Sequence, residues 1–259
     1  MPNIHKDLSG YIATITLNNP EKRNALSRAM SEAIMAALEE FRALKARVVV
    51  LRAPRGATTW SAGHDVNELP KPGRDPLSYN DPLLNLIRAI QYSPMPVIAL
   101  IEGGVWGGAC DVAMSCDILV GCPTTTFTMT PARMSIPYNV SGILHFVNIL
   151  GVNMVKEMLF TARPVSAEKA LQVAILNHLV SEEEIEPFTY GLAAHITQNS
   201  PLSIASMKEQ VRLLASAHPL TPIMFERIQG LRRQVYDSKD YEEGLRAFHE
   251  KRRPVFTGE

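Results

Sequence analysis

Hydrophobic residues recur at two different periods along the first 100 residues, and the two periods alternate. Residues 11–17 alternate apolar and polar side chains, which is typical of a strand. From Ser27 to Leu44 apolar residues recur every three or four positions, which predicts an amphipathic helix with Ser27 as its N-cap. The apolar runs 48–51 and 96–101 predict strands buried on both faces, and residues 83–90 predict a helix between them. This order predicts an α/β layered core with parallel strands.

The pattern changes after Val180. Residues 181–184 (Ser-Glu-Glu-Glu) match a capping box, and helical periodicity then continues to Phe248, with breaks expected at Pro201, Pro219, Pro222 and Gly230. We therefore divide the chain into an α/β core, residues 1–195, and a C-terminal helical region, residues 196–259.

Composition excludes several classes of protein. Hydrophobic residues make up 46% of the 259 residues and charged residues 20%, which are ordinary globular values. Positive and negative side chains balance at 26 each, so no global basic field favours nucleic acid or an anionic membrane. The N-terminus lacks the apolar segment of a signal peptide, and the most apolar stretch, 97–122, is interrupted by acidic residues. Three cysteines without a CxxC or zinc spacing indicate reduced thiols in a cytoplasmic protein with no metal site.

Two glycine-flanked loops follow predicted strands and are the candidate site. The first is residues 61–66 (SAGHDV), and the second is residues 102–111 (EGGVWGGACD), where a helix is expected to begin near Gly107 or Gly108. Small residues let the backbone approach a ligand, and one outward amide from each loop would make an oxyanion hole. Each loop alone is also compatible with an ordinary tight turn, and His64 with an ordinary surface or core histidine. Neither loop carries a phosphate-binding GxGxxG or GK[ST] pattern.

The strings SAGHD (61–65) and IEGGVWGGACDVAMSCD (101–117), in this order and spacing, resemble the crotonase, or enoyl-CoA hydratase/isomerase, superfamily. The resemblance runs from about residue 11 to the C-terminus. It implies a spiral of ββα turns, acyl-CoA thioester substrates, and trimers that often pair into hexamers, with 196–259 as the trimerisation region. It also implies that the amides of His64 and Gly108 form the oxyanion hole. Coenzyme A would then be part of the substrate, and no separate cofactor would be required.

The same resemblance implies where the coenzyme binds. Relatives hold the nucleotide with backbone and basic groups that match Lys22, Arg23 and Ala25, and with the first loop. A C-terminal lysine that reaches the coenzyme matches Lys251, although a solvated charged tail explains residues 250–254 equally well. The expected coenzyme A contacts are Lys22, Arg23, Ala25, Ala62, Gly63, His64, Asp65, Val66 and Lys251.

The side chains around the hole must decide the reaction. Hydratases in this superfamily use two glutamates; the first falls at Asp111 here, and the second should lie near 128–138, yet residues 118–156 contain no Asp or Glu. A loop without carboxylates suits decarboxylation of a malonyl-type thioester, because a glutamate there would repel the carboxylate of the substrate. Further strings, including SAGHDVNELP (61–70) and SMKEQVRLL (206–214), resemble decarboxylating members of the superfamily. We therefore expect methylmalonyl-CoA to be converted to propionyl-CoA and CO₂.

Two side chains are candidates for handling the carboxylate. Tyr138 is expected to orient it through the hydroxyl and Thr130 to donate a nearby hydrogen bond, although a packed loop aromatic and an ordinary threonine explain them as well. Asp111 fits either a catalytic carboxylate or an anion at a helix start. Short-chain enoyl-CoA hydration or isomerisation remains the alternative reaction. A non-catalytic crotonase that binds RNA or a protein is the alternative class, while a serine peptidase lacks its G-x-S-x-G elbow.

Overall fold

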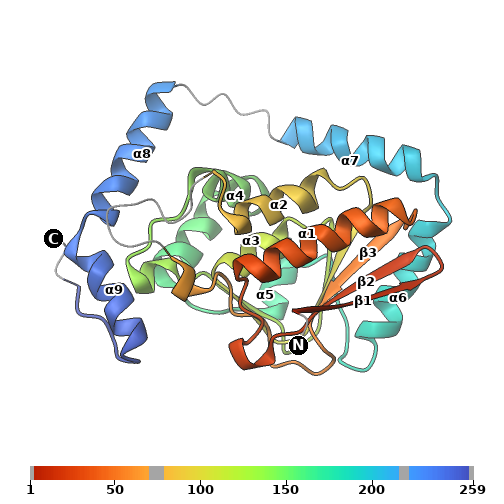
Figure 1. Ribbon diagram of the computed structural model, residues 1–259, viewed down its shortest axis with the longest axis horizontal. Helices are drawn as coiled ribbons and strands as arrows, with labels where there is room; N and C mark the ends of the chain where they lie inside the picture. Colours follow the sequence, from red (N-terminus) through yellow and green to blue (C-terminus); the bar gives the residue numbers. More distant parts are fainter. Residues whose placement is uncertain (1–2, 70–78, 216–221, 257–259) are drawn as a thin grey trace.

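The computed structural model describes residues 3–69, 79–215 and 222–256 and contains two β-sheets covered by helices (Figure 1). The larger sheet has six strands in the order β1-β2-β3-β5-β7-β10, and the smaller has four in the order β4-β6-β8-β9. The larger sheet consists of β1 (Ile4–Ser9), β2 (Ile12–Leu17), β3 (Val48–Arg52), β5 (Val97–Ile101), β7 (Ile118–Gly121) and β10 (His178–Leu179). The smaller sheet consists of β4 (Thr59–Ser61), β6 (Gly104–Trp106), β8 (Thr126–Thr128) and β9 (Val165–Ser166).

The chain moves between the two sheets in a repeated order. From β3 it passes to β4, from β5 to β6 and from β7 to β8, and helical segments return it to the larger sheet. Neighbouring strands in these steps are parallel, whereas β1 and β9 pair antiparallel with β2 and β8. This arrangement is the expected α/β spiral of ββα turns, so the predicted fold class is confirmed.

Nine α-helices and three short 3₁₀ helices lie in the described part of the chain. The first α-helices are α1 (Arg28–Ala43), α2 (Pro82–Tyr92), α3 (Gly108–Met114), α4 (Val140–Thr161), α5 (Ala167–Gln172) and α6 (Ile185–Thr197). The last three are α7 (Pro201–Ala215), α8 (Pro222–Tyr236) and α9 (Lys239–His249), and the 3₁₀ helices are η1 (Pro20–Lys22), η2 (Val66–Glu68) and η3 (Pro131–Met134).

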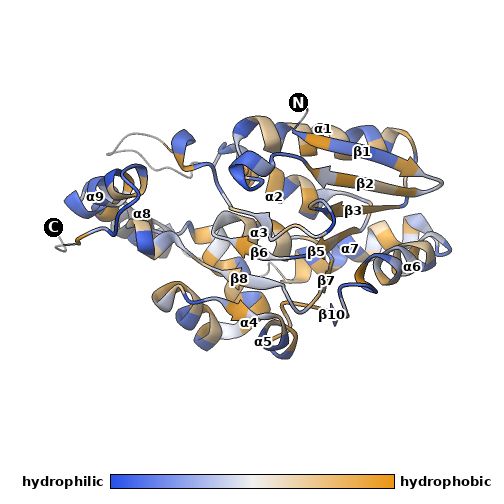
Figure 2. Cartoon of the chain, turned by 90° about the horizontal axis from the view of Figure 1, so that it is seen from below, coloured by the Kyte–Doolittle hydropathy of each residue, from blue (hydrophilic) through white to orange (hydrophobic). Residues whose placement is uncertain are grey.

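The central strands are buried on both faces, as their continuous apolar sequences predict. In β3, Val49 and Leu51 belong to the larger hydrophobic cluster with α1 and α2, whereas Val48 and Val50 pack on the opposite face with α6. Figure 2 shows the strongly hydrophobic colouring of β2 and β3 between these layers. Ser27 caps α1 by accepting a hydrogen bond from the Met30 amide, which confirms the predicted start of that helix.

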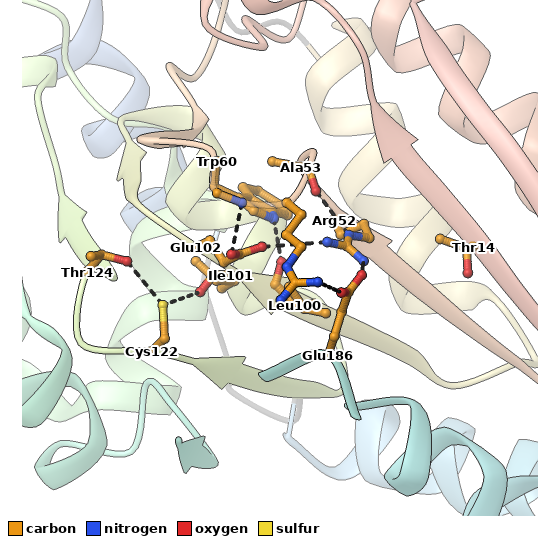
Figure 3. A network of polar contacts seen from close by, with 12 residues as sticks. Thr14, Arg52, Ala53, Trp60, Leu100, Ile101, Glu102, Cys122, Thr124 and Glu186 are labelled. Carbon is orange, nitrogen blue, oxygen red and sulfur yellow. Dashed lines mark hydrogen bonds and ion pairs between the residues drawn. The ribbon is translucent and has the colours of Figure 1, made fainter. Parts of the chain in front are cut away.

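A buried ion cluster joins the end of β3 to α6 (Figure 3). The Arg52 guanidinium pairs with Glu186 of α6 and lies 3.6 Å from Glu102, which follows β5. Nearby, the Trp60 indole donates to the carbonyl of Leu100 at 2.9 Å. This hydrogen bond of Trp60 holds β4, and hence the first glycine loop, against the larger sheet.

Several local predictions were wrong. Residues 181–184 are not a capping box: the Ser181 hydroxyl bonds the Glu184 side chain, and α6 begins only at Ile185. Gly230 does not break α8, because a single helical glycine costs only about 1 kcal/mol. The second predicted loop, 102–111, contains the short strand β6, and β4 ends at Ser61, the first residue of the first predicted loop. The breaks expected at Pro201 and Pro222 are confirmed, because a new helix begins at each, and Pro219 lies outside the described residues.

The C-terminal helices extend away from the sheets. Figure 1 shows α7 along one side of the molecule and α8 and α9 at its far end. The boundary set at residue 195 falls in the last turn of α6, which packs on β3 and β5. None of the 15 residues of α7 is buried, and Leu202, Val211 and Leu214 are exposed.

The apolar stretch 97–122 forms buried core elements, from β5 to β7, as expected. In the described residues the one helix with the length and composition of a membrane span is α4. Gly151 interrupts α4 with a non-helical conformation, φ 72° and ψ 160°, so the helix has two shorter halves.

Candidate active site

The two glycine loops meet at one edge of the smaller sheet. β4 and β6 are parallel, with Ser61 opposite Val105, so their carboxyl ends lie side by side. Ala62 to Asp65 follow β4, and Gly107 follows β6 and leads directly into α3. The pairing of two short strands therefore brings together two loops whose residues His64 and Gly108 are 44 positions apart in the sequence (108 − 64).

The backbones of the two loops are in close contact. A Cβ atom on Gly63, whose φ is +86°, would lie 2.3 Å from the Trp106 carbonyl oxygen and 3.0 Å from the Gly108 nitrogen. Gly107 also has a positive φ of +52°, and its amide donates to the Thr128 carbonyl at 2.8 Å. Only glycine at Gly63 allows this approach without a clash.

The backbone amides of His64 and Gly108 lie close together. Leu26 bonds the residues on either side of His64, at Gly63 O and Asp65 N, so the N–H of His64 faces away from Leu26. Gly108 is the first residue of α3, where an N–H has no intrahelical acceptor. A Cβ on Gly108 would lie 3.5 Å from the His64 nitrogen. Within the described residues neither amide has a hydrogen-bond acceptor, so both can donate to a carbonyl oxygen, as an oxyanion hole requires.

The His64 ring is fixed by two contacts. Its Nδ1 lies 3.1 Å from the Asp65 carbonyl oxygen, and its Nε2 lies 3.4 Å from Oδ2 of Asp81. Burial opposes the charged form, but the hydrogen bond and charge of Asp81 outweigh it and raise the pKa of His64 above its usual value. Asp81 was not predicted from the sequence as a site residue. An Asp-Pro pair before an apolar helix is a signal for an N-cap, and the Asp81 side chain does cap α2 by accepting a hydrogen bond from the Leu83 amide.

Asp111, Tyr138 and His145 form a second cluster. The Tyr138 hydroxyl donates to Oδ2 of Asp111 at 3.2 Å, and Nδ1 of His145 lies 2.9 Å from Oδ1. Asp111 is 2% exposed and Tyr138 8%. Burial and the negative charge of Asp111 raise the pKa of Tyr138 well above its usual range, so the phenol stays protonated. A Cβ on Gly142 would lie 2.3 Å from the Tyr138 ring, so a larger residue at that position would displace the ring.

The two clusters are neighbours through α3. Asp111 is three residues after Gly108, which places both on one face of the helix. Thr130 lies next to Gly107, since its hydroxyl is 3.0 Å from the position that a Cβ on Gly107 would take. His145 is a residue that sequence reasoning missed, because nothing in the local pattern of α4 distinguishes it from the surrounding polar positions.

Some of the expected coenzyme A residues are held together by main-chain bonds. The amide of Ala62 donates to the Arg23 carbonyl at 2.9 Å, and the Leu26 amide donates to the Gly63 carbonyl at 2.7 Å. Ala25 is buried beside them, whereas Arg23 is exposed. Residues 22–26 thus border the first loop along its length.

The charge of Lys22 is partly neutralised. Its Nζ lies 2.9 Å from Oδ2 of Asp65, a buried carboxylate that also caps η2 through Asn67 N. The hydrogen bond to Asp65 raises the pKa of Lys22. Val66 begins η2 next to this pair.

Lys251 lies apart from these residues. It follows α9, which packs against η3, and its side chain is exposed. In the described part of the chain no hydrogen bond or ion pair joins Lys251 to residues 22–26 or 61–66. Also within these ranges, no group of three or more His, Cys, Asp or Glu is arranged to hold a metal ion.

Comparison of the sequence with models of protein families shows the family to which this chain belongs. The family model described as enoyl-CoA hydratase/isomerase matches residues 7–259. The chain belongs to the enoyl-CoA hydratase/isomerase family. The resemblance of the two glycine loops to that family is thereby confirmed.

Members of the enoyl-CoA hydratase/isomerase family with different activities resemble this chain to different degrees. Methylmalonyl-CoA decarboxylase of Escherichia coli (strain K12) is 49% identical over 247 residues, 95% of each chain. Carnitinyl-CoA dehydratase of Salmonella typhi is 30% identical over 258 residues, 99% of this chain and 98% of the relative. A solved methylmalonyl-CoA decarboxylase in complex with 2-nitronate-propionyl-CoA superposes with a TM-score of 0.97 at 47% identity and covers 99% of both chains. The chain is therefore much more similar to the decarboxylase than to the dehydratase.

Proposed function

We propose that this protein is an enzyme that decarboxylates methylmalonyl-CoA to propionyl-CoA and CO₂. The observation that carries the proposal is the pair of unpartnered amides at His64 and Gly108, which lies next to the hydrogen-bonded Tyr138 and Asp111. Residues 118–156, where a hydratase would have its second catalytic glutamate, contain no Asp or Glu. The 49% identity to a methylmalonyl-CoA decarboxylase supports the same reaction and substrate.

The geometry suits each stage of this reaction. The thioester oxygen of the substrate accepts hydrogen bonds from the amides of His64 and Gly108. Cleavage of the carbon–carbon bond releases CO₂ and leaves its electron pair in an enolate, whose oxygen carries the new charge. Each such donor is worth about 10²–10³ in rate, or roughly 2.7–4 kcal/mol. A proton then adds to the α-carbon, and no base has to remove one beforehand.

The carboxylate of the substrate lies between the side chains that flank the hole. We place it near Thr130 on one side and Tyr138 on the other, with the His64 ring as a third polar group. Supporting this placement, Thr130 borders Gly107, immediately before α3, and Tyr138 borders Asp111 in the first turn of α3.

The adenosine phosphates of coenzyme A need positive groups. We assign them to the surface formed by Lys22, Arg23 and residues 62–66, with Lys251 as a further contact. Arg23 is exposed with its main chain bonded to the first loop, which supports this assignment. An Arg23→Met variant should raise the KM for methylmalonyl-CoA with little change in kcat, because the phosphates do not react.

Hydration is the second candidate because Asp111 occupies the position of a hydratase glutamate and is contacted by a histidine. Parallel assays with methylmalonyl-CoA and crotonyl-CoA separate the two reactions. We expect CO₂ and propionyl-CoA from the first and little hydration of the second. Efficient hydration of crotonyl-CoA with no CO₂ from methylmalonyl-CoA would contradict the proposal.

We also propose a homotrimer, or a hexamer formed from two trimers, assembled through residues 196–259. The support is α7, which has no buried residue and exposes Leu202, Val211 and Leu214, a surface that a second copy would cover. Light scattering coupled to size-exclusion chromatography should give the mass of three or six chains, and a monomer would contradict it.

Two further proposals concern the conditions under which the enzyme works. We expect decarboxylation to need no cofactor, so dialysis against a chelator should leave the rate unchanged. We also propose a cytoplasmic location, supported by Cys110, Cys116 and Cys122, which are all buried and free. Fractionation of cells that produce the protein tests this location.

A further inference from the structure

Asp111 controls which way the hydrogen bond of Tyr138 points. Both oxygens of this buried carboxylate are occupied, Oδ2 by the Tyr138 hydroxyl and Oδ1 by Nδ1 of His145. A carboxylate can only accept hydrogen bonds, so the one proton of the Tyr138 hydroxyl is directed at Asp111. The phenol oxygen then has only lone pairs left for any other neighbour.

His145 keeps this arrangement in place. Because Oδ1 of Asp111 accepts, the proton of the imidazole is on Nδ1. That bond, at 2.9 Å, prevents the carboxylate from turning away from Tyr138. The Tyr138 ring is held in turn by Phe146, with ring centroids 5.4 Å apart, and by its close approach to Gly142.

The directed hydroxyl lies next to the oxyanion hole. Asp111 shares a face of α3 with Gly108, and side chains of a helix lean toward its N-terminus, here toward the hole. A substrate whose thioester oxygen is held by Gly108 therefore brings its α-carbon and carboxylate near the Tyr138 oxygen.

We propose that Asp111, held by His145, is a positioning residue that stops the Tyr138 hydroxyl from donating a hydrogen bond to the carboxylate of the substrate. The inference rests on the decarboxylation proposed above. On the Tyr138 side, the substrate carboxylate therefore meets a lone pair of the phenol oxygen instead of a hydrogen-bond donor.

This arrangement speeds the loss of CO₂ by destabilising the ground state. The negative charge leaves the carboxylate and moves to the enolate oxygen as the bond breaks. A hydrogen bond donated to the carboxylate would therefore stabilise the substrate more than the transition state and would slow the reaction. The main-chain amides of His64 and Gly108 stabilise the enolate oxygen, the atom to which the negative charge moves.

Asp111→Asn tests this proposal because it keeps the shape and reverses the hydrogen bond. The new amide NH₂ donates to the Tyr138 oxygen, its carbonyl still accepts from His145, and the Tyr138 hydroxyl is free to donate to the substrate. We expect kcat and KM for methylmalonyl-CoA both to fall, each by roughly tenfold, the effect of one hydrogen bond to a charged group. Inhibition by propionyl-CoA, which has no carboxylate, should not change.

A double-mutant cycle separates this role from a merely structural one. In the Tyr138→Phe background, Asp111→Asn should no longer lower KM by this amount, because no hydroxyl is left to redirect. His145→Leu removes the donor to Asp111 and should shift kcat and KM in the direction of Asp111→Asn, and His145→Asn, which retains a donor near the Nδ1 position, should shift them less. The His145 pair also tests the proposal if Asp111→Asn does not fold.

The outcomes are distinct. A raised KM in Asp111→Asn, a fall in kcat without a fall in KM, or the same effect in the Tyr138→Phe background would overturn the positioning role. Absence of CO₂ release by the wild type would instead overturn the proposed function.

Discussion

Gly108 is the position where one methyl group should remove most of the activity without unfolding the protein. In Gly108→Ala the new Cβ would lie 3.5 Å from the His64 nitrogen, which is the space between the two amides. The enolate oxygen needs a place about 2.7–3.1 Å from both nitrogens. The methyl group therefore takes the volume that the charged oxygen must occupy.

The cost to the fold should be small by comparison. Gly108 is in the helical conformation at the start of α3, so alanine adds no backbone strain. The methyl group would lie 2.6 Å from Cδ2 of Leu83, the end of a flexible side chain that can move, at a cost of about 1–3 kcal/mol. The better helix propensity of alanine offsets about 1 kcal/mol of that. The melting temperature should therefore fall by only a few degrees, at roughly 2–4 °C per kcal/mol.

The activity should fall much further. Loss of one donor lowers the rate by about 10²–10³, and obstruction of the shared space affects both donors. The assay is kcat/KM for CO₂ release from methylmalonyl-CoA, together with a thermal melt. Gly191→Ala is the matched control, because Gly191 is an exposed helical position with nothing within 4 Å of the added Cβ. A folded Gly108→Ala enzyme as active as this control would refute the oxyanion hole.

Three further variants test other parts of the molecule. Tyr138→Phe should slow CO₂ release while leaving the affinity for propionyl-CoA unchanged; intact turnover would exclude Tyr138 from contact with the carboxylate. Asp81→Asn should lower the pKa of His64, measured by NMR titration of the imidazole, because the carboxylate that raises this pKa is removed. The His64–Asp81 ion pair adds stability below about pH 6.5, and this stability is lost as the pH rises through the raised pKa of His64. The wild type and Asp81→Asn should therefore differ more in unfolding free energy at acid pH than at alkaline pH. Lys208→Met removes the ammonium group that lies 2.7 Å from Asp117. Loss of a fully buried ion-pair partner costs about 3–5 kcal/mol of unfolding free energy, and the loss here should be smaller because the Asp117 side chain is 27% exposed. An unchanged denaturant midpoint would show that α7 is anchored by other contacts.

Long periodic segments of the fold were predictable from the sequence. Ser27 and the spacing of the residues after it identify α1, and the β-branched run 48–51 identifies β3. The three-residue strands β4 and β6 were not predictable, because their few residues show no period and their identity depends on pairing with each other. The same limit applies to residues 181–184, where the sequence matches a cap but the helix starts later.

The main-chain part of the site was predictable, and its side-chain network was not. The glycines around His64 and Gly108 are visible in the sequence because close backbone contact requires them. Asp81 and His145 come from helices that only the folded chain brings to the site, at 17 and 34 residues from their partners. Tyr138 was expected to face the substrate, but the direction of its hydrogen bond depends on Asp111, which sequence alone does not reveal.

Because both donors of the hole belong to the peptide backbone, a point substitution cannot delete either one in the way that it deletes a catalytic hydroxyl. New chemistry on this scaffold can therefore be explored by exchanging the groups at positions 111, 138 and 145 while the means of holding an enolate stays in place. For an engineer, the durable part of this enzyme is a feature of its chain path, and in the mechanism proposed above the groups at these three positions are its replaceable neighbours.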